Sequence, residues 1–151
     1  MRYLILQFGS LLFLSCAVNV NASSTRAIAI RQRPVVLASA PVSVILDLGR
    51  QRARALAVAR DPKRTLMLRV EGIRVEGSPA VYEVYVGRIL AGTLATYGAE
   101  EQNGKFIAAV PIDAAAEPAL ARGPARLTIR FVPASESNGT IRFQRLRLIA
   151  E

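Results

Sequence analysis

The sequence predicts an all-β fold, a two-sheet antiparallel sandwich of jelly-roll type with about eight strands and one short helix. The chain has 151 residues, of which 52% are hydrophobic, so it can bury the core of one domain. Several stretches of strand length alternate between inward-facing and outward-facing residues. Ten glycines and eight prolines are spread along the chain, as turns between many short strands require.

The first 22 residues have the composition of a secretory signal peptide. Arg2 supplies a positive charge, an uncharged and mainly apolar run covers residues 3–18, and a small-residue cleavage pattern ends at Ala22. The run is shorter than a membrane-spanning helix requires. We therefore expect cleavage after Ala22 and an exported mature chain, located in the periplasm or outside the cell.

Cys16 is the single cysteine of the sequence and lies inside this apolar run. It is either an ordinary apolar residue of the signal segment or, after Phe13-Leu14-Ser15, the attachment point of a lipid anchor. Such an anchor, or an uncleaved signal segment, is the expected route to a membrane. Cleavage after Ala22 leaves a mature chain without cysteine, which its core alone must hold together.

Residues 23–41 form a lead-in that is rich in Ser, Ala and Arg and contains Pro34 and Pro41. We expect a flexible N-terminal arm or an edge segment here. The alternating pattern begins after Pro41, so the sandwich domain is placed at residues 42–151.

Period-two alternation predicts strands over residues 42–47, 66–71 and 126–131, each with one buried face and one wet face. The run 81–86 is rich in β-branched and aromatic residues, which favour strands. Residues 50–60 are also expected to be a strand, because their alanines alternate with arginine, leucine and valine.

The one predicted helix covers residues 113–122. It would begin at Asp113 and end before Gly123-Pro124, although Pro118 weakens a helix interior.

The last predicted strand changes face along its length. Ile141 and Phe143 occupy odd positions, whereas Leu146 and Leu148 occupy even positions. One face cannot bury both pairs without a local shift, so we predict a β-bulge at residues 144–145. Asn-Gly pairs at residues 103–104 and 138–139 predict tight hairpin turns.

The sequence contains no histidine. This excludes histidine-ligated copper, zinc and iron sites, and also Ser-His-Asp and Cys-His catalysis. Phosphate-binding loops and dinucleotide-binding motifs are absent as well, and the carboxylates are scattered rather than paired. We therefore expect a non-enzyme with no catalytic residue, no metal ligand and no cofactor.

The formal net charge is +9, and 18 of the 20 basic residues are arginine. Nucleic acid is not the expected partner, because the arginines are dispersed and no aromatic residues lie between them. Arg50, Arg52 and Arg54 would share one face of a strand. That face is either a docking surface for an acidic partner or anionic polymer, or the charged wet face of an edge strand.

Tyr97 and Phe106 flank a predicted loop and are candidate contact residues. Aromatic side chains at such a place either fill a pocket on a partner or cap the end of the core.

Three stretches resemble the C-terminal β-sandwich domain of tyrosinases and polyphenol oxidases. Residues 66–87, LMLRVEGIRVEGSPAVYEVYVG, are similar to that domain's strand ending in Glu-Gly-Ile and the strand after it. Residues 91–98, AGTLATYG, resemble its segment leading to an aromatic-Gly corner. Residues 125–149, ARLTIRFVPASESNGTIRFQRLRLI, are similar to its closing pair of strands.

In that family the domain usually follows a histidine-rich copper domain, covers the copper site and keeps the enzyme latent. The resemblance therefore implies an accessory role beside a separately encoded, tyrosinase-like type-3 copper enzyme, either shielding it or assisting it, and not oxidase activity. The alternative is a structural or adhesive envelope module. Such a module would bind polysaccharide, an anionic surface or another protein through its arginine-rich face.

Overall fold

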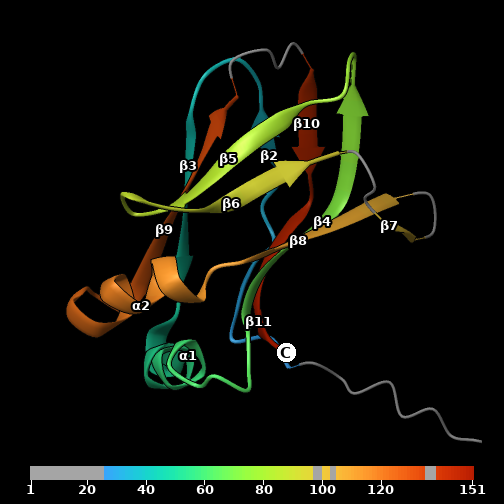
Figure 1. Cartoon of the computed structure of the whole chain (residues 1–151). Coiled ribbons are helices and arrows are strands. Elements are labelled where there is room, and N and C mark those ends of the chain that lie inside the picture. Colours follow the sequence, from blue (N-terminus) through green and yellow to red (C-terminus); the bar gives the residue numbers. More distant parts are fainter. Residues whose placement is uncertain (1–25, 97–99, 103–104, 135–138) are drawn as a thin grey trace, which may run out of the picture.

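The computed structural model describes residues 26–96, 100–102, 105–134 and 139–151. The chain forms two antiparallel sheets that face each other, with both helices at one end (Figure 1). The strands are β1 (Ala29–Arg31), β2 (Val35–Leu37), β3 (Val42–Asp47), β4 (Leu66–Glu76), β5 (Val81–Val86), β6 (Ile89–Ala95), β7 (Glu100–Gln102), β8 (Lys105–Pro111), β9 (Arg126–Pro133), β10 (Thr140–Phe143) and β11 (Arg145–Ala150). The helices are the 3-10 turn η1 (Gly49–Gln51), α1 (Arg52–Ala59) and α2 (Asp113–Arg122).

The larger sheet is built around β4, its longest strand. Strands β10 and β11 follow one another along one edge of β4, and β8 lies along the other edge. Strands β2 and β1 pair with the outer sides of β10 and β11, and β7 pairs with β8. The smaller sheet has the order β3-β9-β5-β6. These two sheets confirm the predicted all-β sandwich.

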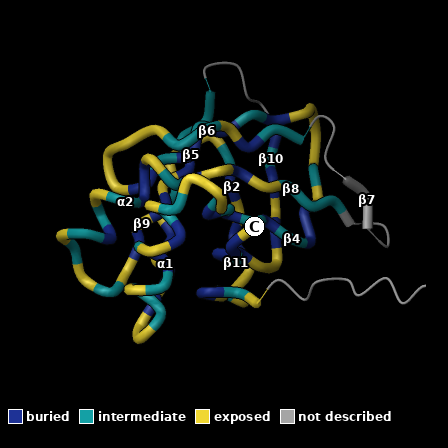
Figure 2. Tube along the Cα trace, turned by 60° about the horizontal axis from the view of Figure 1, so that its bottom comes forward, coloured by how far each residue is buried: buried dark blue, intermediate teal, exposed yellow. Residues whose placement is uncertain are grey.

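The core fills the space between the sheets, as Figure 2 shows by the buried positions on the strands. Phe131 of the small sheet meets Phe143 of the large sheet, with ring centroids 5.7 Å apart. Tyr82 is fully buried, and its hydroxyl lies 3.2 Å from the carbonyl oxygens of Ala38 and Gly139. Each can accept its proton, so this buried polar group is satisfied.

The change of face predicted near residues 144–145 exists, but two strands share it. In β4 the buried side chains occupy even positions up to Val70, but the next one is Ile73, at an odd position. The buried face of β4 therefore changes at Gly72. The pairing of β4 with β10 and β11 keeps one register across this point. The register shift lies instead between β4 and β8, where Gly72 is the extra residue of β4.

The prediction of a bulge on the final strand is therefore wrong, because the extra residue belongs to β4. It lies beside Gln144, however, where the sequence predicted the change of face. Gly72 has a φ of +70°, which glycine adopts without the cost that a side chain brings. The Gln144 backbone N–H donates to the Glu71 carbonyl at 3.0 Å, so β4 stays hydrogen-bonded to the segment between β10 and β11 where the buried face changes.

The predicted strand over residues 50–60 is wrong, because these residues form η1 and α1. Ala55 and Val58 are buried, three positions apart, which is helical spacing. The alternation of alanine with larger residues concealed this spacing, since alanine suits either face. The predicted helix over 113–122 is confirmed as α2.

The lead-in is an edge segment rather than a flexible arm over the part that the structure describes. Strand β1 pairs with β11, and β2 pairs with β10, so the two strands form outer edges of the large sheet. These strands and β7 bring the total above the expected number. Residues 1–25, with the predicted signal segment, and the predicted turns at residues 103–104 and Asn138 lie outside the described residues. No helix within the described ranges has the length and apolar character needed to cross a membrane.

Candidate functional site

A charged cluster lies on the outer face of the large sheet, where β4 and β11 run side by side. Residues 69 and 71 of β4 alternate with buried Leu68 and Val70, and residues 145 and 147 of β11 alternate with buried leucines. The register pairs Arg147 with Arg69 and Arg145 with Glu71. Period-two geometry therefore places three arginines and one glutamate on one face.

Glu71 binds all three arginines. Arg147 Nη1 donates to Glu71 Oε1 at 3.1 Å, and Arg145 Nη1 donates to Glu71 Oε2 at 3.2 Å. Arg69 Nε lies 3.2 Å from Glu71 Oε1 but makes no hydrogen bond there. The glutamate side chain is only 14% exposed, whereas that of Arg145 is 47% exposed. The carboxylate thus lies at the base of the cluster, with an arginine nearer to solvent.

The cluster lines an open groove with a volume of about 710 Å³, which we call the arginine groove. Its described lining residues are Gln32, Pro34, Arg69, Glu71, Gly72, Ile107, Gln144, Arg145 and Arg147. Gln32 and Pro34 come from the segment that joins β1 to β2, so the lead-in forms one wall.

Glu71 offsets repulsion that the sheet register creates. Arg69 and Arg147 are directly opposite each other on neighbouring strands, and like charges in that position destabilise a sheet. One carboxylate between them relieves the repulsion but leaves an excess of positive charge among the described lining residues.

The arrangement favours binding rather than catalysis. A guanidinium does not release its proton in proteins, so the three arginines cannot act as general acids or bases. Glu71 faces no second carboxylate among the described lining residues. No group of three potential metal ligands occurs among the described residues, and the sequence has no histidine, so the residues present do not fit a type-3 copper pair.

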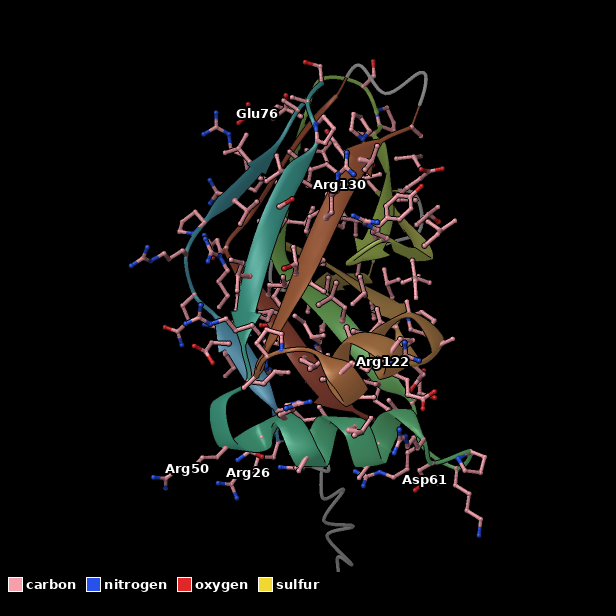
Figure 3. All side chains as sticks on the ribbon, turned by 90° about the vertical axis from the view of Figure 1, so that its left-hand side faces the viewer. Arg26, Arg50, Asp61, Glu76, Arg122 and Arg130 are labelled. Carbon is pink, nitrogen blue, oxygen red and sulfur yellow. The ribbon has the colours of Figure 1, made fainter. Side chains whose placement is uncertain are left out.

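The predicted face of Arg50, Arg52 and Arg54 does not exist, because these residues lie in η1 and α1 instead of a strand. Arg50 is exposed and extends from the end of the molecule into solvent (Figure 3). Arg52 points to α2: its Nε donates to the Leu120 carbonyl at 2.8 Å and its Nη2 to the Ala121 carbonyl at 3.2 Å.

The role of Arg52 is therefore structural. The last carbonyls of a helix have no partner within the helix, and Arg52 binds two of them at the end of α2. These two hydrogen bonds join α1 to α2.

Of the two aromatic candidates, the structure describes only Phe106. Phe106 is in β8 opposite Ile73, is half-buried and packs against the core, which favours its interpretation as a cap. Tyr97 lies outside the described residues.

Sequence reasoning missed the arginine groove. Its signal is present, since residues 69 and 71, and residues 145 and 147, are charged with a period of two. Only the pairing of β4 with β11 brings these two pairs of alternating charged residues together, and the sequence does not specify that pairing.

A second polar pair lies on the outer face of the small sheet. The Tyr85 hydroxyl donates to Glu83 Oε2 at 2.8 Å. This hydrogen bond, with smaller effects of desolvation and of the glutamate charge, raises the Tyr85 pKa above its usual value of 10.0. Arg130, on the neighbouring β9 and labelled in Figure 3, lowers the pKa and partly opposes the shift.

No protein-family profile and no curated protein matches this sequence. Among solved structures, the chain is similar to latent apple tyrosinase, with a TM-score of 0.52 and 16% identity over 78% of this chain and 27% of the enzyme. It is also similar to recombinantly expressed latent aurone synthase, a polyphenol oxidase, with a TM-score of 0.52 and 16% identity over 77% of this chain and 25% of the enzyme. The form from a natural source gives a TM-score of 0.51 and 15% identity over 77% of this chain and 26% of the enzyme.

The chain thus spans about a quarter of the length of these enzymes. The resemblance predicted from the sequence is confirmed in the fold, which is consistent with a domain like the C-terminal part of latent plant polyphenol oxidases.

Proposed function

We propose that this chain is a non-catalytic binding domain that associates with a tyrosinase-like copper enzyme and shields or assists its copper site. The observation that carries the proposal is the fold match to a quarter of enzymes that are each described as latent. The missing histidines support it, because this domain cannot hold the copper pair itself. The copper site would belong to a separately folded domain.

The proposal also places the mature domain outside the cytoplasm, in the periplasm or beyond the cell. Residues 1–22 support this part, because their composition is that of a secretory signal peptide. Mass measurement of the chain recovered from its host tests it, and an intact N-terminus in the cytoplasm would contradict it.

The first test is a titration of enzyme activity. Purified chain is added to an exported tyrosinase-type enzyme from the same source, with and without copper preloading, and diphenol oxidation is followed. Saturable inhibition, or faster activation by copper, supports the proposal. Unchanged rates at high excess of the chain contradict it.

Two matched variants locate the contact face. Ile45 on the outer face of the small sheet is 51% exposed, and Ile30 on edge strand β1 of the large sheet is 48% exposed. Replacement of either by glutamate puts a charge on one sheet with little cost to the fold, since both side chains are half in water. Loss of the effect with Ile45→Glu alone would assign the contact to the small sheet, and loss with Ile30→Glu alone to the large sheet.

The alternative function, an envelope module that binds polysaccharide, an anionic surface or another protein, has support of a different kind. Its expected arginines lie in η1 and α1 and form no strand face, but the arginine groove gathers three others around one carboxylate. Binding to anionic polymer that weakens steeply with salt would favour this function.

A further inference from the structure

We infer that the arginine groove binds a phosphate monoester group carried by a small organic molecule or a lipid. This inference does not depend on association with a copper enzyme. It rests on the charge, the donor geometry and the lining of the groove, and each of these narrows the class of ligand.

The charge of the groove complements a dianion. Among its described lining residues, Arg69, Arg145 and Arg147 contribute three positive charges and Glu71 one negative charge, which gives 3 − 1 = +2. A phosphate monoester carries a charge of about −1.5 to −2 at neutral pH, so it neutralises that excess. A single carboxylate would leave positive charge in the groove.

Arg69 and Arg145 have N–H donors that Glu71 does not accept. Each guanidinium has five N–H donors, whereas an ionised carboxylate offers about four acceptor positions. Arg69 Nε is buried without a hydrogen bond, and Arg145 reaches from Glu71 Oε2 toward solvent with nearly half of its side chain exposed. The planar fork of an arginine matches two phosphate oxygens at once, which a point charge such as lysine does not.

The lining argues against nucleic acid and for a compact ligand. Bases bind single-strand sites by stacking on aromatic side chains, and none of the described lining residues is aromatic. The carboxamides of Gln32 and Gln144 lie in the lining and suit hydroxyl groups of the carrier. The volume of about 710 Å³ leaves room for a carrier beyond the phosphate itself.

The test is calorimetric titration of the purified chain with inorganic phosphate and with glycerol 3-phosphate. Glycerol serves as the neutral control, and chloride keeps the ionic strength constant. Arg145→Gln is expected to weaken binding about tenfold, because one charge-assisted contact is lost. The matched control is Arg142→Gln: Arg142 is on β10, is also exposed and also pairs with a glutamate of β4, Glu76 at 3.0 Å, but does not line the groove. Its affinity for phosphate should equal that of the original chain.

A second variant covers the case in which Arg145→Gln does not fold. Glu71→Gln removes the competing negative charge, so phosphate should bind more tightly and raise the melting temperature more than it does for the original chain. Binding no stronger than that of chloride would overturn the inference, as would equal losses in Arg145→Gln and Arg142→Gln, or a Glu71→Gln variant with weaker phosphate binding.

The source of the phosphate is resolved by a vesicle experiment. Phosphatidylcholine vesicles with and without phosphatidic acid compare a lipid monoester with soluble glycerol 3-phosphate. Capture only by vesicles with phosphatidic acid, lost in Arg145→Gln, supports a lipid headgroup, and binding only of glycerol 3-phosphate supports a soluble ligand. Vesicle capture that Arg145→Gln leaves unchanged overturns the inference. Because no copper enzyme takes part, failure here leaves the proposed function untouched.

Discussion

Replacement of Gly72 by alanine should destabilise the domain far more than the same change in an open turn. Gly72 has a φ of +70°, and a Cβ at this position would lie 3.0 Å from Gln144 Oε1, 3.1 Å from Gln144 Cβ and 3.2 Å from Gln144 Cδ. The Gln144 Cβ cannot move away by side-chain rotation, so the backbone of the neighbouring strand would have to shift. Gly87 in the β5–β6 turn is the matched control, since its φ is +61° and nothing lies within 4 Å of its Cβ position.

The two glycines separate a backbone cost from a steric cost. Alanine in a left-handed conformation costs about 1–2 kcal/mol. About 0.4–1 kcal/mol of this is offset, because alanine restricts the unfolded chain more than glycine does. Gly87→Ala should therefore cost about 1 kcal/mol. Overpacking against Gln144 adds about 1–3 kcal/mol, so Gly72→Ala should cost about 2–4 kcal/mol.

Urea unfolding followed by far-ultraviolet circular dichroism measures both costs, since the chain has no tryptophan for a fluorescence assay. Gln144→Gly removes all three contacting atoms, so in the Gly72→Ala background, compared with Gln144→Gly alone, it should restore about 1 kcal/mol. Equal costs for Gly72→Ala and Gly87→Ala, or no restoration in the double variant, would refute the steric reasoning.

Three further predictions concern the helices and the small sheet. Arg52→Ala should cost about 1.5–3 kcal/mol in urea unfolding, since it removes both bonds to the end of α2, whereas Arg50→Ala should change stability by less than about 0.5 kcal/mol. Asp113→Ala should cost about 1–2 kcal/mol, because its Oδ1 accepts the first backbone N–H of β4 at 2.5 Å, and Asp113→Asn, which keeps an acceptor, should cost less. Glu83→Gln should lower the raised pKa of Tyr85, seen as phenolate absorbance at lower pH and assigned by its loss in Tyr85→Phe. Because folding raises the Tyr85 pKa, the stabilisation from this hydrogen bond is complete below the usual tyrosine pKa and is lost as the pH rises through the folded-state pKa. A Tyr85 pKa that stays the same in Glu83→Gln would show that the hydrogen bond is not the cause of the shift.

The sequence predicted the strands that bury one face, because their side chains record that burial directly. Leu66, Leu68 and Val70 of β4, and the matching residues of β9, alternate as expected. The sequence failed at α1, where Ala55 and Val58 face the core but small alanines on other sides hide the helical period. It could not reveal that Arg52 binds carbonyls 68 and 69 residues away.

The candidate site was less predictable than the fold. The charged residues of β4 and β11 look like ordinary wet positions when each strand is read alone, and their meaning depends on the register between strands 76 residues apart. The density of arginine over residues 50–54 predicts a shared face there, but density in the sequence is unrelated to proximity in this fold.

The position of β4 has a consequence for how the chain folds. Leu66–Glu76 leaves the ribosome early, but the strands that satisfy its two edges, β8 on one side and β10 and β11 on the other, are made only with residues 105–150. Until then β4 is a strand with one apolar face and both edges open, which is a template for pairing with another chain. Sandwiches dominated by such distant pairings fold slowly. During synthesis β4 is therefore the segment most exposed to misassociation, and the segment that a chaperone would have most reason to cover.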